Sequence, residues 1–183
     1  MTQSQKNIFK KPDFCNTLLL LLVLVLGANK INAQASCGTC TTLITGSDTG
    51  AYTISTGQII CIDTNAIFSG TIVLNGGTIC NNGIMSPASV TLTSGTIINN
   101  SNLSLPGNVS IGANISLTNN PGSVSNVSGS LTVSGSTIVN DGVLNVDTQL
   151  NFSGGTFSNY NVINCIGGSG QSNITNTGII NSN

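Results

Sequence analysis

The sequence has 183 residues, a length that suits a single domain, and only 5% of its residues are charged. All four basic residues (Lys6, Lys10, Lys11 and Lys30) precede Ala33, there is no histidine, and the later charges are four aspartates. A surface without Lys or Arg cannot neutralise phosphates, so nucleic acid and anionic membranes are poor candidates as partners. The abundance of Ile, Val and Leu argues against disorder.

The first 33 residues have the organisation of a secretory signal peptide. Three lysines precede the apolar run LLLLLVLVL at 18–26, and Ala33 and Ala35 provide small side chains for cleavage. The run has nine residues, whereas a membrane-spanning helix needs about 20. We therefore expect residues 1–33 to be removed, leaving a secreted or cell-surface chain with no transmembrane segment.

Residues 34–55 carry Cys37 and Cys40 and are less regular than the residues that follow. Stacked β-repeats need a cover for their first exposed strands. We expect residues 34–55 to be this N-terminal cap and residues 56–183 to be the repeats. The last repeat stops within NITNTGIINSN, so we expect either a frayed final coil or a longer natural chain.

An apolar anchor residue followed two places later by asparagine occurs six times in the repeats. The anchors are Ile79, Ile97, Leu117, Ile138, Phe157 and Ile174, at separations of 18, 20, 21, 19 and 17 residues. The asparagines are Asn81, Asn99, Asn119, Asn140, Asn159 and Asn176. A small polar residue precedes each anchor. This regularity indicates an architecture of stacked repeats.

A period near 19 residues is about the length of one β-solenoid coil. Segments such as TIVLN, VTLTS and DTQLNF have the β-branched and apolar residues typical of strands, and no segment of the exported part has a helical period. Pro87, Pro106 and Pro121 lie in sequences typical of corners. We therefore predict an all-β fold, a parallel β-helix of about six or seven coils.

Stacking places the same position of every repeat above its counterpart, so the anchors would fill the lumen. Asparagine tolerates left-handed backbone at turns, and its amide both donates and accepts hydrogen bonds. We expect the six asparagines to stack as a hydrogen-bonded ladder along the axis. A row of ligand-binding asparagines is the alternative interpretation.

Five cysteines remain after the predicted cleavage, and an exported chain can keep disulfides. Cys61 and Cys80 are one coil apart, which would bring their Cα atoms to about 4.8 Å, within the range of a disulfide. We expect Cys61 to pair with Cys80, and Cys37 with Cys40 as a local or reducible pair. The sequence around CGTC suits neither a redox motif nor a zinc site. Cys165 has no evident partner, which suggests a free buried thiol.

Residues 55–83, STGQIICIDTNAIFSGTIVLNGGTICNNG, resemble the N-terminal region of large secreted surface proteins of Bacteroidota, of the type IX-secreted, gliding-motility type. The resemblance implies an adhesin-like protein with a β-solenoid region ahead of a C-terminal sorting domain. The other repeats are similar to this family only in style, and the 183 residues contain no sorting or anchoring module of that kind. The resemblance implies no catalytic residues.

The favoured function is a non-enzymatic, structural or adhesin-like module, with glycans or other surface proteins as partners. We expect no cofactor, no catalytic residue and no metal ligand.

Two alternatives remain open. A polysaccharide lyase or hydrolase would need paired carboxylates or a metal, and Asp141 and Asp147 could lie near one corner, although turn formation and solvation explain them as well. An ice-binding or surface-binding solenoid would use a threonine row. Such a row is Thr78, Thr96, Ser116, Thr137 and Thr156, but the column after the anchors is mixed.

Overall fold

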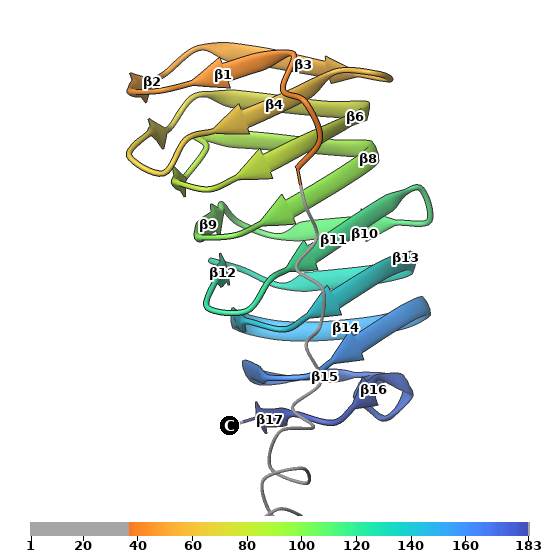
Figure 1. The fold of residues 1–183 in the computed structure, drawn as a ribbon. Helices are drawn as coiled ribbons and strands as arrows, with labels where there is room; N and C mark the ends of the chain where they lie inside the picture. Colours follow the sequence, from red (N-terminus) through yellow and green to blue (C-terminus); the bar gives the residue numbers. More distant parts are fainter. Residues whose placement is uncertain (1–36, 183) are drawn as a thin grey trace, which may run out of the picture. The chain divides into compact units, whose positions relative to one another are not determined.

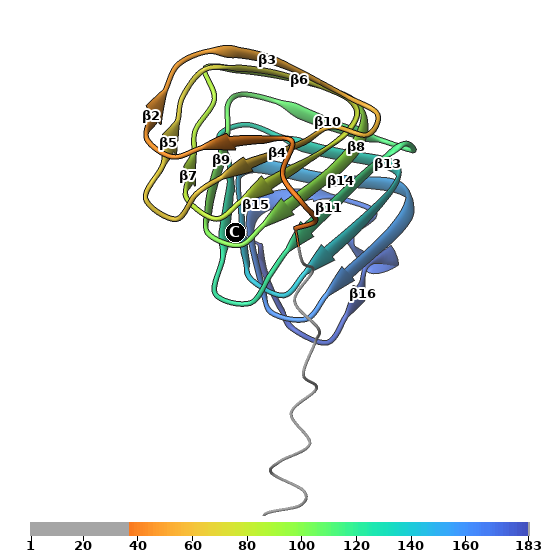
Figure 2. The same cartoon turned by 45° about the horizontal axis from the view of Figure 1, so that its top comes forward.

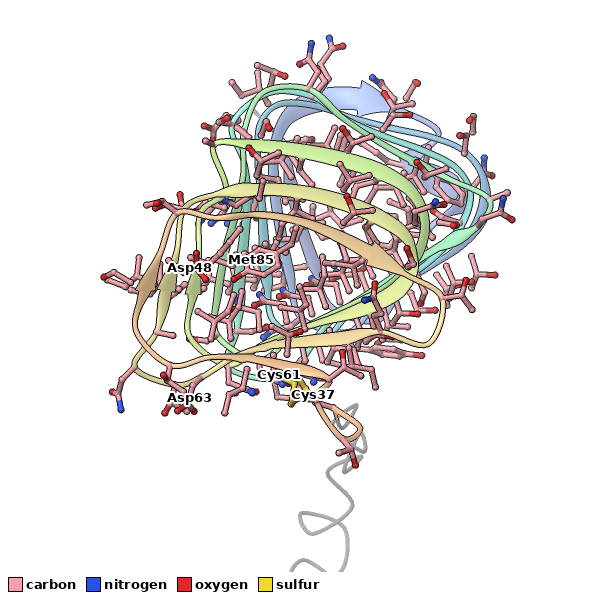
Figure 3. The ribbon with its side chains drawn as sticks, turned by 90° about the horizontal axis from the view of Figure 1, so that it is seen from above. Cys37, Asp48, Cys61, Asp63 and Met85 are labelled. Carbon is pink, nitrogen blue, oxygen red and sulfur yellow. A yellow bond between two sulfur atoms is a disulfide. The ribbon has the colours of Figure 1, made fainter. Side chains whose placement is uncertain are left out.

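The computed structural model describes residues 37–182. These residues form an all-β parallel solenoid of about seven coils with a period near 19 residues, which confirms the predicted fold class (Figure 1). The coils wind around a common axis (Figure 2), and the view from above shows side chains inside them (Figure 3). The predicted signal peptide, 1–33, lies outside the described residues.

Each coil contains up to three extended runs, which we call faces A, B and C in chain order. Face A consists of β1 (Thr42–Ile44), β4 (Ile59–Ile62), β11 (Ile115–Asn119), β16 (Thr175–Asn176) and the last parts of β6 (Thr71–Asn81), β8 (Ser89–Asn99), β13 (Leu131–Asn140) and β14 (Val143–Asn159). Face B consists of β2 (Ser47–Asp48), β5 (Ile67–Phe68), β7 (Ile84–Met85), β9 (Asn102–Leu105), β12 (Val124–Val127), β17 (Ile179–Ser182) and the first parts of β14 and β15 (Val162–Ser169). Face C consists of β3 (Ala51–Ser55), β10 (Val109–Gly112), the first parts of β6, β8 and β13, the middle of β14 and the end of β15. A short 3-10 helix, η1 (Gln171–Asn173), precedes β16.

Neighbouring coils are joined by parallel pairing that keeps equivalent residues in register. On face A, Ile79 pairs with Ile97, and Leu117 pairs with both Ile97 and Ile138. The predicted anchors therefore form one column. All six anchors are at most 6% exposed. Burial of each such side chain contributes roughly 1.5 to 3 kcal/mol, so the column is a main source of stability.

Residues 42–55, which fall within the predicted cap, form the first coil. Thr42 pairs with Ile60 of the second coil on face A, and Ala51 pairs with Thr71 on face C. This coil has the same order of faces as the later ones. The end of the solenoid is thus a regular coil, and the residues before it run along the outside, as described below.

Glycine provides the left-handed backbone at the bends, whereas we expected asparagine to do so. No residue other than glycine has a positive φ in the described part of the chain. Gly95 and Gly155 lie where face C turns into face A, with φ of 123° and 97°. A Cβ atom there would meet the backbone oxygens of Gly77 and Ser136 in the preceding coil. Glycine is needed both for the backbone angle and for the close stacking.

Face C is interrupted between β8 and β10. The same two coils are paired on face A through the last parts of β6 and β8 and on face B through β7 and β9, but no pairing joins β8 to β10 in the described structure. Val90 and Leu92, which are in register with the buried Ile72 and Leu74, are only partly buried. The solenoid is therefore held by two faces instead of three at this junction.

Candidate functional site

The six predicted asparagines form a ladder inside the solenoid, at the corner between faces A and B. Each amide nitrogen Nδ2 donates to Oδ1 of the asparagine in the following coil at 2.7 to 2.8 Å. The ladder runs through Asn81, Asn99, Asn119, Asn140, Asn159 and Asn176. The first five members are at most 1% exposed. The predicted ladder is confirmed, and we call it the interior ladder.

The second N–H of these amides is also used. Nδ2 of Asn119 donates to the carbonyl oxygen of Val143 at 3.0 Å, and Nδ2 of Asn140 donates to that of Val162 at 3.0 Å. A buried amide without partners would cost free energy, so this bonding explains how polar side chains are accommodated in the lumen. Buried amides whose donors are engaged in this way are structural, and do not form a ligand site.

The predicted cysteine pairing is wrong. Disulfides join Cys37 to Cys80 and Cys40 to Cys61, each with Cα atoms 5.7 Å apart. Cys61 and Cys80 do pair in register on face A, as their spacing indicated. Their side chains nevertheless do not bond to each other, and the reason lies in the residues that precede the first coil.

Residues 37–41, which we call the strap, lie outside face A (Figure 3) and run against the order of the coils (Figure 1). Successive side chains of a strand point to opposite sides, and the anchors next to Cys61 and Cys80 point into the lumen. The two cysteine side chains therefore both point outward, side by side. They are at most 1% exposed because the strap covers them. Each therefore meets a strap cysteine. Thr41 then donates to the carbonyl oxygen of Ile59 at 3.0 Å, which ties the strap to the second coil.

Cys165 is a free and buried thiol. Gln171 donates from Nε2 to its Sγ at 3.3 Å. Burial raises the pKa of the Cys165 thiol, and the hydrogen bond from Gln171 offsets this effect only in part. A thiol held in its protonated form is a poor nucleophile, so Cys165 contributes packing at this position.

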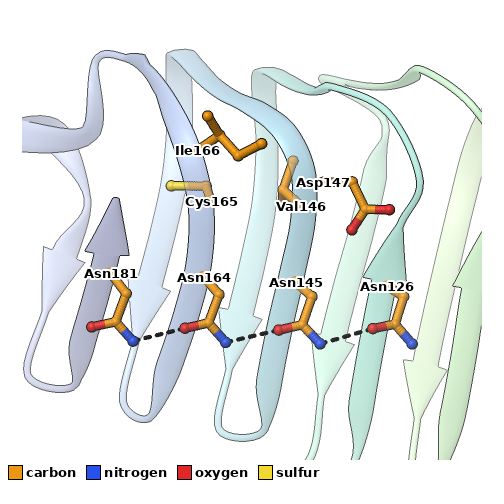
Figure 4. Close-up of a pocket in the computed structure, with 8 residues that line it drawn as sticks. All are labelled: Asn126, Asn145, Val146, Asp147, Asn164, Cys165, Ile166 and Asn181. Carbon is orange, nitrogen blue, oxygen red and sulfur yellow. Dashed lines mark hydrogen bonds between the residues drawn. The ribbon is translucent and has the colours of Figure 1, made fainter. Parts of the chain in front are cut away.

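A second asparagine ladder, which we did not predict, runs along the outside of face B (Figure 4). It consists of Asn126, Asn145, Asn164 and Asn181, and each later Nδ2 donates to Oδ1 of the preceding coil at 2.7 to 2.8 Å. We call it the exterior ladder. The signal was present in the sequence, because VSNV, VLNV, VINC and IINS place asparagine third at separations of 19, 19 and 17 residues.

The exterior ladder differs from the interior ladder in its unused bonding groups. In the described part of the chain, the side-chain amides of Asn145 and Asn164 make the hydrogen bonds of the ladder and no others. An amide has two N–H donors and two lone pairs on its oxygen. One donor and one lone pair of each middle amide therefore remain available to solvent or to a ligand.

A groove follows the exterior ladder at the corner between faces B and C. One part, of about 690 Å³, is lined by the exterior ladder and by Val146, Asp147, Cys165 and Ile166 (Figure 4). A second part, of about 240 Å³, is lined by Ser86, Pro87, Ser104, Leu105, Pro106, Asn126, Ser128 and Asp147. Because both parts share Asn126 and Asp147, they form one continuous groove. It crosses six successive coils, or about 24 Å at roughly 4.8 Å per coil.

The groove has little charge. Asp147 is the one charged residue among those that line it, and residues 37–182 contain no Lys, Arg or His. Phosphate or carboxylate groups would find no counter-charge there. The groove thus suits an uncharged ligand that can use amide donors and acceptors.

Asp141 and Asp147 do not share a corner. Asp141 lies between faces A and B, Asp147 lies between faces B and C, and the extended run 143–146 separates them. Four extended residues span about 13 Å, beyond the roughly 5 to 9.5 Å that separates paired glycosidase carboxylates. The carboxylate pair that the enzyme alternative needs is therefore not assembled.

The predicted threonine row does stack. Thr78 pairs with Thr96, Ser116 with Thr137, and Thr137 with Thr156, on the outer side of face A. The neighbouring outward column is mixed, since it contains Cys80, Ile98, Thr118, Val139, Ser158 and Thr175. The threonine row is therefore regular along the solenoid axis but is not matched by a second regular column beside it.

Within residues 37–182 there is no group of three or more His, Cys, Asp or Glu residues arranged to hold a metal ion. The same part of the chain has no helix that is long and apolar enough to cross a membrane. Comparison with family models, with curated proteins and with solved structures gave no match.

Proposed function

We propose that the chain is a non-enzymatic, secreted or cell-surface module with an adhesin-like role. In this proposal the solenoid is a rigid support, and the groove along face B contacts the partner. The observation that carries the proposal is the groove itself, which extends over six coils of a frame cross-linked by hydrogen bonds along its axis. Solenoid proteins bind their partners through such extended surfaces.

The disulfides and the N-terminal sequence support an extracellular location. Cys37–Cys80 and Cys40–Cys61 are bonds that persist in oxidising compartments and are rare in the cytosol. The predicted signal peptide points to the same location. The resemblance of residues 55–83 to secreted surface proteins of Bacteroidota supports an adhesin-like role, with glycans or other surface proteins as partners.

The proposal is tested by export and retention of the full chain. We expect an expression host to export it, and the purified exported protein to be retained on films of at least one polysaccharide or bacterial surface preparation. The film should stay intact, with no soluble sugar released. The matched control is the same protein reduced and unfolded, which should be washed off.

Two results would contradict the proposal. One is a chain that stays inside the cell or that no surface retains. The other is release of sugar fragments that disappears with Asp141→Asn or Asp147→Asn, which would favour the alternative of a carbohydrate-active enzyme.

A second candidate function is binding to ice or to a crystal surface. The observation that favours it is the stacked row on face A, where Thr137 and Thr156 are exposed. If the adhesin-like proposal holds, the purified protein should show no thermal hysteresis. Hysteresis that is lost in Thr137→Tyr and retained in a face C control, Thr132→Tyr, would establish the second candidate instead.

A further inference from the structure

We infer that the groove along the exterior ladder binds an uncharged, linear glycan, laid parallel to the solenoid axis. This inference rests on the proposed function, because it names the partner class and the surface that the adhesin-like module would use. Three features of the groove carry it: its unused amide groups, its exposed apolar side chain Ile166 and its repetition along the axis.

The unused amide groups match hydroxyl groups. Each middle amide of the exterior ladder keeps one N–H donor and one oxygen lone pair. A hydroxyl is also both donor and acceptor, so one sugar hydroxyl can bond to either group of the same amide. In the interior ladder the second donor goes to a backbone carbonyl. The exterior ladder can therefore bond to a ligand through N–H groups that in the interior ladder already bond to the backbone.

The exposed apolar side chain of Ile166 matches the C–H faces of sugar rings. Ile166 is 59% exposed although it is a large apolar side chain, and it lies beside Val146 and Cys165 in the wider part of the groove (Figure 4). Leu105 and Pro106 line the narrower part. Covering Ile166 would remove apolar surface from water, which favours binding.

The repetition selects a polymer. Equivalent amides recur once per coil, about 4.8 Å apart, over four coils and so over about 14 Å of the groove. A ligand that bonds to successive amides must present hydroxyl groups at a comparable repeat. A chain of several sugar units meets this requirement, whereas a single sugar would contact only one or two coils.

Other polymers fit the groove less well. Acidic polymers would meet Asp147 and no basic side chain, and a polycation would find only that one carboxylate. An extended peptide binds by adding a strand to an exposed sheet edge. The groove offers no such edge at its centre, because β14 is paired on both sides, with β12 and with β15.

The test is binding of the purified, exported full chain to soluble polysaccharides, measured by isothermal titration calorimetry. The uncharged probes are a glucan, a mannan and a galactan, and the charged probes are polygalacturonate and polylysine. We expect at least one uncharged probe to bind and neither charged probe to do so. Asn145→Ala should weaken binding about tenfold, because it removes the amide at the centre of the groove.

Matched controls separate the groove from the rest of the surface. Asn151→Ala changes the same strand, β14, but on face C, and should bind as the unchanged protein does. Ile166→Ser should also weaken binding, whereas Leu43→Ser, which alters a side chain of similar exposure on the first coil, should not. Thermal unfolding of each variant checks that the fold is kept, and the two pairs serve as substitutes for each other if one variant does not fold.

The inference is overturned if no uncharged probe binds, if a charged probe binds better, or if Asn145→Ala and Asn151→Ala bind equally well. If the groove variants Asn145→Ala and Ile166→Ser are still retained on the surface films, the adhesin-like proposal holds and only the groove is excluded as the binding site. If the unchanged protein is not retained on any film, the proposed function itself is contradicted.

Discussion

The role of an asparagine in this solenoid depends on whether water reaches its amide. The interior ladder is buried and bonded to the backbone as well as along the axis. The exterior ladder is bonded along the axis alone and is open to solvent. The same residue type at the same period thus stabilises the lumen in one place and presents unused donors and acceptors in another.

Replacement of Asn140 should cost far more stability than replacement of Asn145. Asn140→Ala leaves a donor of Asn119, Oδ1 of Asn159 and the carbonyl of Val162 without their partner in a buried site. We expect a loss of about 2 to 4 kcal/mol in the free energy of unfolding, measured with chemical denaturant. Asn145→Ala, where water can replace the amide, should lose about 1 kcal/mol or less. Equal losses would show that the interior ladder is not a special source of stability.

Asp48 provides a pH-dependent contact on the first coil. Its carboxylate accepts hydrogen bonds from the Tyr52 hydroxyl at 2.6 Å and from the Gly50 N–H at 2.6 Å, and these lower the pKa of Asp48. The ionised form therefore stabilises the fold above the ordinary carboxyl pKa, and this contribution is lost as the pH falls through the lowered pKa.

Tyr52→Phe should raise the pKa of Asp48 toward its ordinary value, because the larger of the two causes is removed. Carboxyl-carbon NMR titration measures the shift. Tyr160→Phe, which changes a tyrosine far along the solenoid, should leave the Asp48 titration unchanged. An Asp48 titration that is the same in Tyr52→Phe and in the unchanged protein would contradict the assigned cause.

At the scale of elements, the strap joins coils that are also paired by their strands. Its two disulfides close loops with sequence separations of 43 and 21 residues. In the chain-entropy description, such loops contribute about 4 and about 3 kcal/mol to stability. The strap therefore cross-links coils at the end of the solenoid where no strand is stacked on the first coil in the described residues.

Cleavage before aspartate distinguishes the strap disulfides from the pairing first expected. The cuts fall before Asp48 and Asp63, so Cys37 and Cys40, Cys61, and Cys80 end up on three fragments. With the strap disulfides, mass spectrometry of the unfolded, unreduced digest should find all three fragments in one covalent unit. Pairing of Cys61 with Cys80 would leave the first fragment separate, and reduction is the control that releases all three.

At the scale of the whole molecule, the solenoid should be least protected at the junction of β8 and β10. Solenoid stability is approximately a sum of interfaces between neighbouring repeats, and this interface lacks the pairing on face C. We expect amides of β10 to exchange with deuterium faster than those in the first part of β13, the equivalent run with strands on both sides. Equal protection in the two runs would show that the interrupted face does not weaken the junction.

Stacking in register explains which features the sequence could predict. A residue such as Ile79 or Asn81 recurs because its position recurs, so the fold, the buried anchors and the interior ladder could be read from the period. The exterior ladder has the same kind of signal at Asn145 and Asn164 and could have been found. The partners of Cys61 and Cys80 could not, because the strap belongs to no repeat and its path depends on tertiary contacts.

The strap also decides where a pulling force would enter the molecule. Because Cys37 is bonded to Cys80, tension applied to the chain before Cys37 passes through the sulfur atoms directly into the third coil. The first two coils carry none of this load while the bond is intact. The bond closes off 43 residues of chain, and breaking both disulfides would release about 150 Å of contour length. A chain held through its N-terminal side would thus be reinforced under oxidising conditions and extensible under reducing ones.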